Sequence, residues 1–163
     1  MRKIFFITAA VFLALTSTAL AARSHSVIGV VVVGSEEFSS EAYSRIVANQ
    51  LKPKSGAKIF TGKKIQIQYK TVWANFGGVG TEDNPQREDM IQFAAFSGCT
   101  KVLFFVASNS GDGMKVDAYL CTPSAVEETI TSSRDEDTSD KGARRGVFRR
   151  CVNDFAKDLN KIL

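Results

Sequence analysis

Residues 101–108 read KVLFFVAS, and the arrangement of the whole chain follows from this stretch. It is a continuous apolar run of strand length, preceded by a helical pattern that ends at Gly98 and followed by a turn at residues 109–113. Because apolar residues at successive positions leave no polar face for solvent, the run predicts a strand buried on both faces of a sheet. We expect it to be the central strand.

The segments before this strand predict strands and helices in alternation. Val27–Gly34 is largely β-branched and predicts a buried first strand. A helix capped by Ser39 or Ser40 and ended by Pro53 follows. Residues 65–69 read IQIQY, a strict alternation that predicts a half-exposed strand. The apolar positions of the helix recur at helical spacing and are Tyr43, Ile46, Val47 and Leu51.

A second helix is predicted to start at Asn84, with Pro85 at its first position, and to end at Gly98. Residues 115–122 should fold back antiparallel to the central strand. Residues 126–132 favour a short return strand, with a helix as the alternative. The chain closes with an amphipathic helix whose apolar stripe is Val147, Phe148, Cys151, Val152, Phe155, Leu159 and Ile162.

Together these elements predict an α/β domain of order β-α-β-α-β-β-β-α. Helices between the early strands imply parallel pairing, whereas the late hairpin adds antiparallel strands. We therefore expect one mixed sheet with helices packed on it in two or three layers, formed by residues 22–163.

The first 21 residues have the parts of a secretory signal peptide. Arg2 and Lys3 form a basic start, residues 4–15 are apolar but short for a bilayer span, and residues 19–21 read ALA, a cleavage signal. We expect export with cleavage after Ala21 and no stable membrane insertion afterwards; a retained anchor is the alternative. No cysteine lies near the cleavage point to carry a lipid.

The net charge of +4 comes from 21 Lys and Arg against 17 Asp and Glu. Loss of Arg2 and Lys3 with the leader lowers it to about +2. This small excess gives no support to a nucleic-acid partner, and we predict none.

The chain has three cysteines, so at least one thiol is free or pairs with another chain. The predicted hairpin brings Cys121 opposite the start of the central strand, near Cys99. Two alternatives remain, a Cys99–Cys121 disulfide and three buried free thiols. Cys151 falls on the apolar stripe of the last helix and is predicted to be a small core residue.

Several common sites are not supported by the sequence. His25 is the only histidine, which leaves no histidine-based metal site or triad. The turn after the first strand carries Glu36 and Glu37 without a phosphate-binding glycine motif, which argues against nucleotide binding. Asp135, Asp137 and Asp140 do not fit the calcium-loop pattern and predict a solvated acidic loop. We predict no metal and no cofactor.

The best candidate for a contact site is the segment that begins near residue 72, where the periodicity fails. Its glycines can offer backbone N–H groups to an anion, and its aromatic residues can flank a ligand. A simple turn is the alternative interpretation. The candidate residues are Trp73, Asn75, Phe76, Gly77, Gly78 and Gly80.

Four arginines cluster on the last helix, at Arg144, Arg145, Arg149 and Arg150. A basic face of this kind can meet anionic lipid, cell-wall polymer or an acidic partner. Asp154 and Asp158 follow within two turns, however, so we favour a solvated helix face.

The order of elements resembles the amino-terminal domain of TolB and envelope-assembly proteins of the CsgG type. The likeness is one of topology and covers most of residues 22–163; the β-propeller of TolB and the lipidated cysteine of many CsgG-like proteins are not in this sequence. It implies an envelope protein that binds other proteins, and it transfers no functional residue. The matching pieces are Val27–Gly34, the helix through Ala95, residues 98–103 (GCTKVL), residues 115–132 and the last helix.

Our leading hypothesis is an exported, non-enzymatic domain that mediates protein–protein contacts in the cell envelope or periplasm. The alternative is a small-ligand-binding protein or enzyme with a pocket at the carboxyl ends of the parallel strands, near Glu36, Glu37, Asn75 and Asn109. A third hypothesis is a structural subunit that pairs through Cys151 into a reductant-sensitive dimer.

Overall fold

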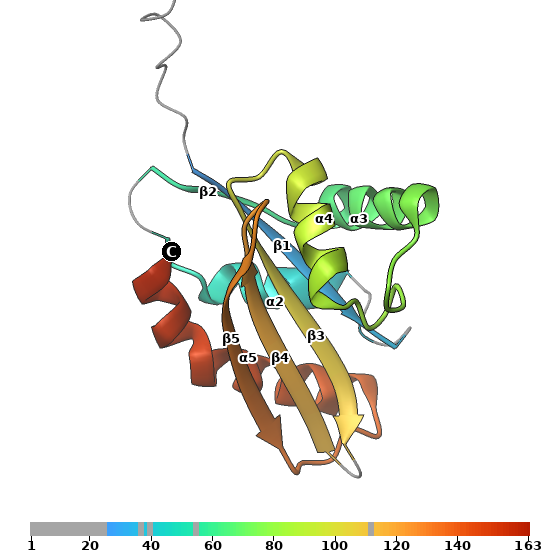
Figure 1. The fold of residues 1–163 in the computed structure, drawn as a ribbon. Coiled ribbons are helices and arrows are strands. Elements are labelled where there is room, and N and C mark those ends of the chain that lie inside the picture. The colour runs from blue at the N-terminus through green and yellow to red at the C-terminus, as the bar shows by residue number, and fades with distance from the viewer. Residues whose placement is uncertain (1–25, 36–37, 39–40, 54–55, 111–112) are drawn as a thin grey trace, which may run out of the picture.

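β3 (Lys101–Ser110) is the middle strand of a five-stranded sheet whose strand order is β2-β1-β3-β4-β5 (Figure 1). Its side chains are buried on both faces, since Leu103 and Phe105 pack on one side of the sheet and Val102 and Phe104 on the other. Burial on both faces requires apolar residues at successive positions. The predicted central strand is therefore confirmed.

The computed structural model describes residues 26–35, 38, 41–53, 56–110 and 113–163. Some predictions fall on residues outside this part of the chain, and these are the leader at residues 1–21, His25, Glu36, Glu37, Ser39 and Ser40.

The sheet is mixed, as predicted. β1 (Val27–Gly34) pairs in parallel with both β2 (Lys58–Phe60) and β3. On the other side of β3, β4 (Gly113–Cys121) and β5 (Val126–Arg134) add antiparallel pairs. The strand interpretation of residues 126–132 is therefore confirmed over the helical one.

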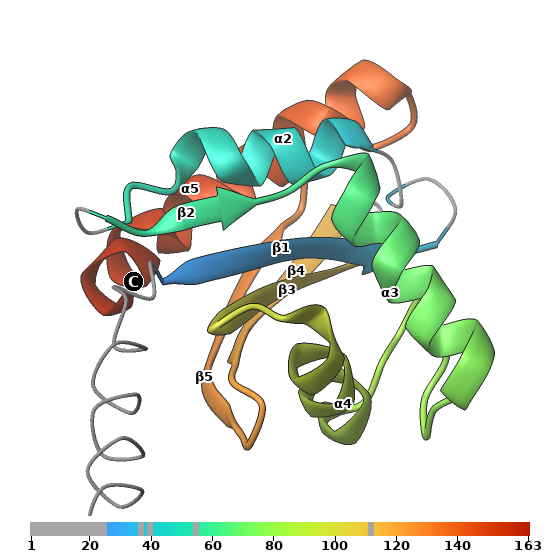
Figure 2. The same ribbon diagram turned by 90° about the horizontal axis from the view of Figure 1, so that it is seen from above.

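Two layers of helices cover the sheet (Figure 2). α2 (Glu41–Gln50) and α5 (Lys141–Ile162) bury their apolar faces against one side, with Tyr43, Val47, Phe148 and Phe155 among the contributing residues. α3 (Lys63–Phe76) and α4 (Arg87–Ser97) contribute Ile65, Tyr69, Met90 and Phe93 to the core on the opposite side. The described part of the chain is thus an α/β domain of three layers.

The prediction of a strand at residues 65–69 is wrong, because these residues form the start of α3. Ile65 and Tyr69 are both buried, and positions four apart share one face of a helix as well as one face of a strand. Ile67 separates the two alternatives, since it would share that face in a strand but is 51% exposed here. Val72 and Trp73 continue the helical spacing and pack against the same core.

Two boundaries also differ from the predictions. The second strand is the three-residue β2, which lies before the strand predicted at residues 65–69. α4 begins at Arg87, two residues after Pro85, because Gln86 and Asp89 form a capping box there. Its predicted end is confirmed, since Gly98 adopts a left-handed conformation with φ of 70°.

Candidate functional site

The predicted contact segment is divided between a helix and a loop. Trp73, Asn75 and Phe76 lie in the last turn of α3, and the irregular segment begins at Gly77 rather than near residue 72. Gly77 has φ of 65°, and its N–H donates to the carbonyl of Trp73 at 2.8 Å. A glycine is favoured at this φ because it carries no Cβ, so Gly77 both ends α3 and turns the chain toward α4.

The loop after α3 is held by the carboxylate of Asp89. This side chain is 4% exposed and accepts hydrogen bonds from the backbone N–H groups of Val79 at 2.7 Å, Gly80 at 2.9 Å and Gln86 at 2.8 Å. The loop does offer N–H groups to an anion, as predicted from its glycines, but the anion is a side chain of the same molecule. These donors are therefore occupied, and the loop is tied to the start of α4.

Aromatic side chains pack beneath this loop. Tyr69 donates its hydroxyl hydrogen to the carbonyl of Glu82 at 2.8 Å, and its ring lies 6.2 Å from that of Trp73. Burial, followed by the charge of Glu82, raises the pKa of Tyr69, so the phenol stays protonated as a donor. A Cβ on Gly78 would lie 2.3 Å from the Trp73 ring, so the loop sits directly on the tryptophan.

Three large apolar side chains project into solvent, one from the end of α3 (Phe76), one from the loop after it (Val79) and one from the last turn of α4 (Phe96). The rings of Phe76 and Phe96 stack with centroids 4.7 Å apart and an interplanar angle of 12°. Each is nevertheless more than half exposed, at 57% and 51%, and Val79, three residues along the loop from Phe76, is 75% exposed. We call Phe76, Val79 and Phe96 the aromatic patch.

Phe96 and Val79 were not among the predicted site residues. On α4 the buried residues Met90, Phe93 and Ser97 follow the helical period, and Phe96 falls beside that stripe. The exposure of Phe96 can be inferred from this offset, because an aromatic residue out of phase with the buried stripe is expected to be exposed.

A polar pocket of about 620 Å³ opens at the carboxyl ends of β1 and β3. Asn109 lines it as predicted, whereas Asn75 does not. On its β4 side, Lys115 and Asp117 form an ion pair of 2.9 Å, and Thr131 donates to Asp117 at 2.5 Å. The lining residues are Gly34, Ser35, Asp83, Asn84, Val106, Ala107, Ser108, Asn109, Lys115 and Asp117.

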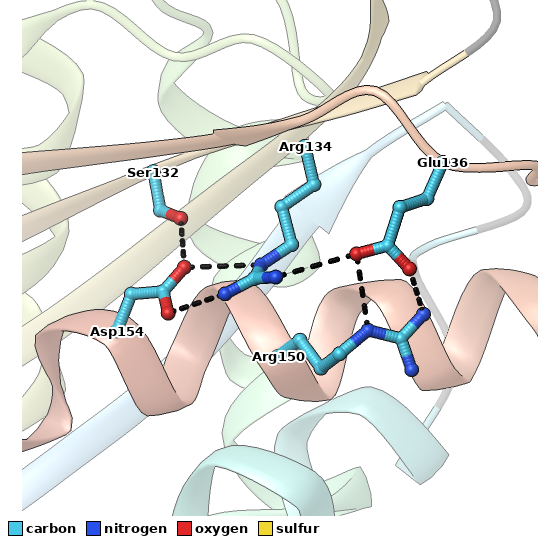
Figure 3. Close-up of polar contacts among 5 residues, drawn as sticks. All are labelled: Ser132, Arg134, Glu136, Arg150 and Asp154. Atoms are coloured by element: carbon cyan, nitrogen blue, oxygen red, sulfur yellow. Dashed lines mark hydrogen bonds and ion pairs between the residues drawn. The ribbon is translucent and has the colours of Figure 1, made fainter.

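The arginines of α5 do not all face solvent freely. Arg150 is bound to Glu136, which also contacts Arg134 at 3.3 Å (Figure 3). Arg134 in turn makes two hydrogen bonds to Asp154, of 2.6 and 3.1 Å, and the hydroxyl of Ser132 donates to the same carboxylate. This network joins the end of β5 to α5 and balances two positive charges with two negative ones.

The other arginines of the predicted basic face differ in exposure, because Arg149 is exposed whereas Arg144 and Arg145 are partly buried. Successive helix positions are about 100° apart, so Arg149 and Arg150 point in different directions.

Asp140 caps α5 by accepting hydrogen bonds from the N–H groups of Gly142 and Ala143. Asp137 accepts from the N–H and the hydroxyl of Ser139. Both carboxylates thus serve the local backbone.

Cys99, Cys121 and Cys151 are free thiols, and all three are buried. Of the two alternatives left by the sequence, the structure has the free thiols rather than the Cys99–Cys121 disulfide. Burial raises the pKa of each, to about 12 for Cys121. Because Cys151 lies on the buried face of α5 and is fully enclosed in the core, its position does not support the third hypothesis of pairing through this residue.

Among the described residues, no helix combines the length and apolar character needed to cross a membrane. Within the same residues, no three histidine, cysteine or acidic side chains come together as a metal site would require.

No protein-family model matches the chain, and no curated protein matches it significantly in sequence. Among solved structures, the chain is similar to the LpoB C-terminal domain from Salmonella enterica, at 15% sequence identity and a TM-score of 0.43. The match covers 76% of this chain and 94% of that chain. A likeness at this TM-score carries no conclusion about function, and the resemblance to TolB and CsgG-type proteins stays a prediction.

Proposed function

We propose that this protein is an exported protein-binding domain of the cell envelope or periplasm, and that the aromatic patch contacts its partner. The observation that supports this proposal is the exposure of Phe76 and Phe96. Their rings stack on each other, yet more than half of each remains in contact with solvent. Clustered exposed apolar side chains are characteristic of protein-interaction surfaces.

The residues that hold the aromatic patch in place also favour binding. Asp89 holds the loop that carries Val79, and Trp73 lies under Gly78. A surface that is already ordered loses less conformational entropy when a partner binds. Aromatic residues on such a surface are frequent hot spots of binding free energy. The partner is therefore a protein that presents apolar side chains to a preformed aromatic surface.

Export depends on the predicted leader at residues 1–21. Intact-mass measurement on protein purified from cells that export it should give a chain beginning at Ala22. A mass that includes residues 1–21 would contradict the export part of the proposal and leave the aromatic patch to be tested separately.

The binding part is tested by crosslinking in intact cells, followed by purification and mass spectrometry. We expect the wild-type chain to recover one recurrent partner and the Phe76→Ser/Phe96→Ser double variant to lose it. Ile67→Ser is the matched control, because Ile67 is equally exposed but lies on another face of α3. Equal recovery by all three chains would contradict a role for the patch.

A second candidate function is supported by the pocket at the carboxyl ends of β1 and β3. Ligands of open α/β sheets commonly bind at this position, and the pocket is large enough for a small polar molecule. Its test is a thermal-shift screen of small envelope metabolites. A hit should be lost in Lys115→Met and retained in the double phenylalanine variant, whereas no hit across a broad panel would count against this function.

A further inference from the structure

β5 is the outermost strand of the sheet, with β4 on one side and no described strand on the other (Figure 1). It is nine residues long, whereas β2 at the opposite edge has only three. The outer backbone N–H and C=O groups of such a strand are available to another strand. A long edge of this kind is the better place for strand addition.

Prolines and bulges, two devices that usually protect an edge, are absent from β5 between residues 128 and 134. It contains no proline, and its pairing with β4 runs in regular register from Met114↔Arg134 to Leu120↔Glu128, with the one irregularity at the Leu120/Cys121 step. Bulges and prolines normally twist or interrupt such edges to prevent pairing. Most of its side chains are also exposed, and these are Glu127, Glu128, Thr129, Thr131 and Ser133.

The sequence of β5, VEETITSSR, identifies what can pair with it. Its centre is Ile130, and the polar residues are arranged so that an antiparallel second copy meets it without opposing like charges. About that centre, Ile130 lies opposite Ile130, Thr129 opposite Thr131, and the two acidic residues opposite serines. The full set of pairs adds Glu128 with Ser132, Glu127 with Ser133, and Val126 with Arg134.

Other self-pairings are less favourable. A parallel, in-register second strand would place both Glu127 and Glu128 opposite their own copies, and like charges directly opposite destabilise a strand pair. An antiparallel pairing centred on Glu128 would also place that residue opposite its own copy. The pairing centred on Ile130 overlaps the whole strand, and its regular part, residues 128–132, makes about one hydrogen bond per paired residue.

We infer that two copies of this chain associate by antiparallel pairing of their β5 strands about Ile130, which joins the two sheets into one of ten strands. The two-fold axis is perpendicular to the sheet, so α5 of both copies lies on the same side. The buried thiols take no part in this dimer. It is also independent of the proposed partner contact, because Phe76 and Phe96 lie on α3 and α4.

The test is sedimentation velocity on the product of the full-length gene, purified from a host that exports and processes it. The measurement is made in reducing buffer over a range of protein concentrations. Wild type should show a reversible monomer–dimer equilibrium. Thr129→Lys/Thr131→Lys places like charges opposite each other twice and should weaken the dimer by roughly tenfold. Thr129→Glu/Thr131→Lys places opposite charges at the same positions and should preserve it.

Both double variants change two exposed positions, and denaturation at low protein concentration checks that each is folded. A wild-type chain that stays monomeric up to its solubility limit overturns the inference. A dimer of equal affinity in the two double variants overturns it as well, because it would form through another surface.

Discussion

The backbone N–H of Val79 donates a hydrogen bond of 2.7 Å to the side chain of Asp89. This bond joins the loop after α3 to the first turn of α4, and through it the most exposed apolar side chain of the aromatic patch is attached to the folded core. The exposed surface therefore depends on a buried carboxylate.

Replacement of Asp89 should destabilise the protein. In Asp89→Ala, three backbone N–H groups lose their acceptor, and we expect the free energy of unfolding to fall by about 2 kcal/mol. Chemical denaturation measures this, and Asp89→Asn, which keeps one acceptor oxygen, should lose less. Glu88→Ala is the control at the neighbouring exposed position. If Asp89→Ala loses no more unfolding free energy than this control, Asp89 does not hold the loop.

Two glycine substitutions should act in opposite directions. A Cβ on Gly78 would lie 2.3 Å from the Trp73 ring and 2.6 Å from the Asp89 carboxylate, so Gly78→Ala should cost about 1–3 kcal/mol. Gly146 is inside α5, and a Cβ there meets only the end of Arg150 at 3.5 Å. Gly146→Ala should stabilise by roughly 0.5–1 kcal/mol. Thermal unfolding of both variants tests these two expectations. A Gly78→Ala variant as stable as wild type would contradict the first of them.

The network on α5 should stabilise the fold only above acid pH. A hydrogen bond from Arg134 lowers the pKa of Asp154, and one from Arg150 lowers that of Glu136. Carboxyls with a lowered folded-state pKa stabilise the protein above their ordinary values of 3.8 and 4.5, and the stabilisation is lost as the pH falls below them. Arg134→Met should therefore lower the melting temperature at pH 7 by a small amount, because the pairs are exposed to solvent.

The same variant should match wild type once the pH is low enough to protonate both carboxyls in the folded protein, which is below their ordinary pKa values. High salt should also narrow the difference at neutral pH, because the pairs are partly exposed. A difference in melting temperature that stays constant from neutral to acid pH would show that Arg134 acts through packing alone.

The three thiols should be unreactive in the native protein. They are buried, and burial raises each pKa, to about 12 for Cys121, so little thiolate forms at neutral pH. Iodoacetamide should label none of them quickly in native conditions and all three in denaturant without reductant. Labelling of only one in denaturant would indicate a disulfide and restore the Cys99–Cys121 alternative.

The central strand, the hairpin and the closing helix were predictable because each has one clear period. Residues 102–107 are apolar throughout, and the stripe from Val147 to Leu159 repeats at helical spacing. Residues 65–69 misled the prediction, because Ile65 and Tyr69 satisfy both periods and only the exposure of Ile67 separates them.

The proposed site overlaps the segment singled out by the sequence only in part. The aromatic and glycine residues after Val72 identified the segment, yet the acceptor of its N–H groups, Asp89, comes ten residues after Val79. Phe96 lies twenty residues after its stacking partner Phe76. Contacts between residues this far apart depend on how α3 and α4 pack, and a local pattern does not encode that packing.

Photocrosslinking from position 79 shows directly whether the aromatic patch contacts a partner protein in the cell. A photoreactive amino acid would replace Val79, which is 75% exposed, and, in a separate chain, Ile67 on another face of α3. Illumination of intact cells should give one discrete protein adduct from position 79 and none from position 67. Adducts to lipid alone, the same adducts from both positions, or no adduct from position 79 would contradict the proposal that the aromatic patch binds a partner protein.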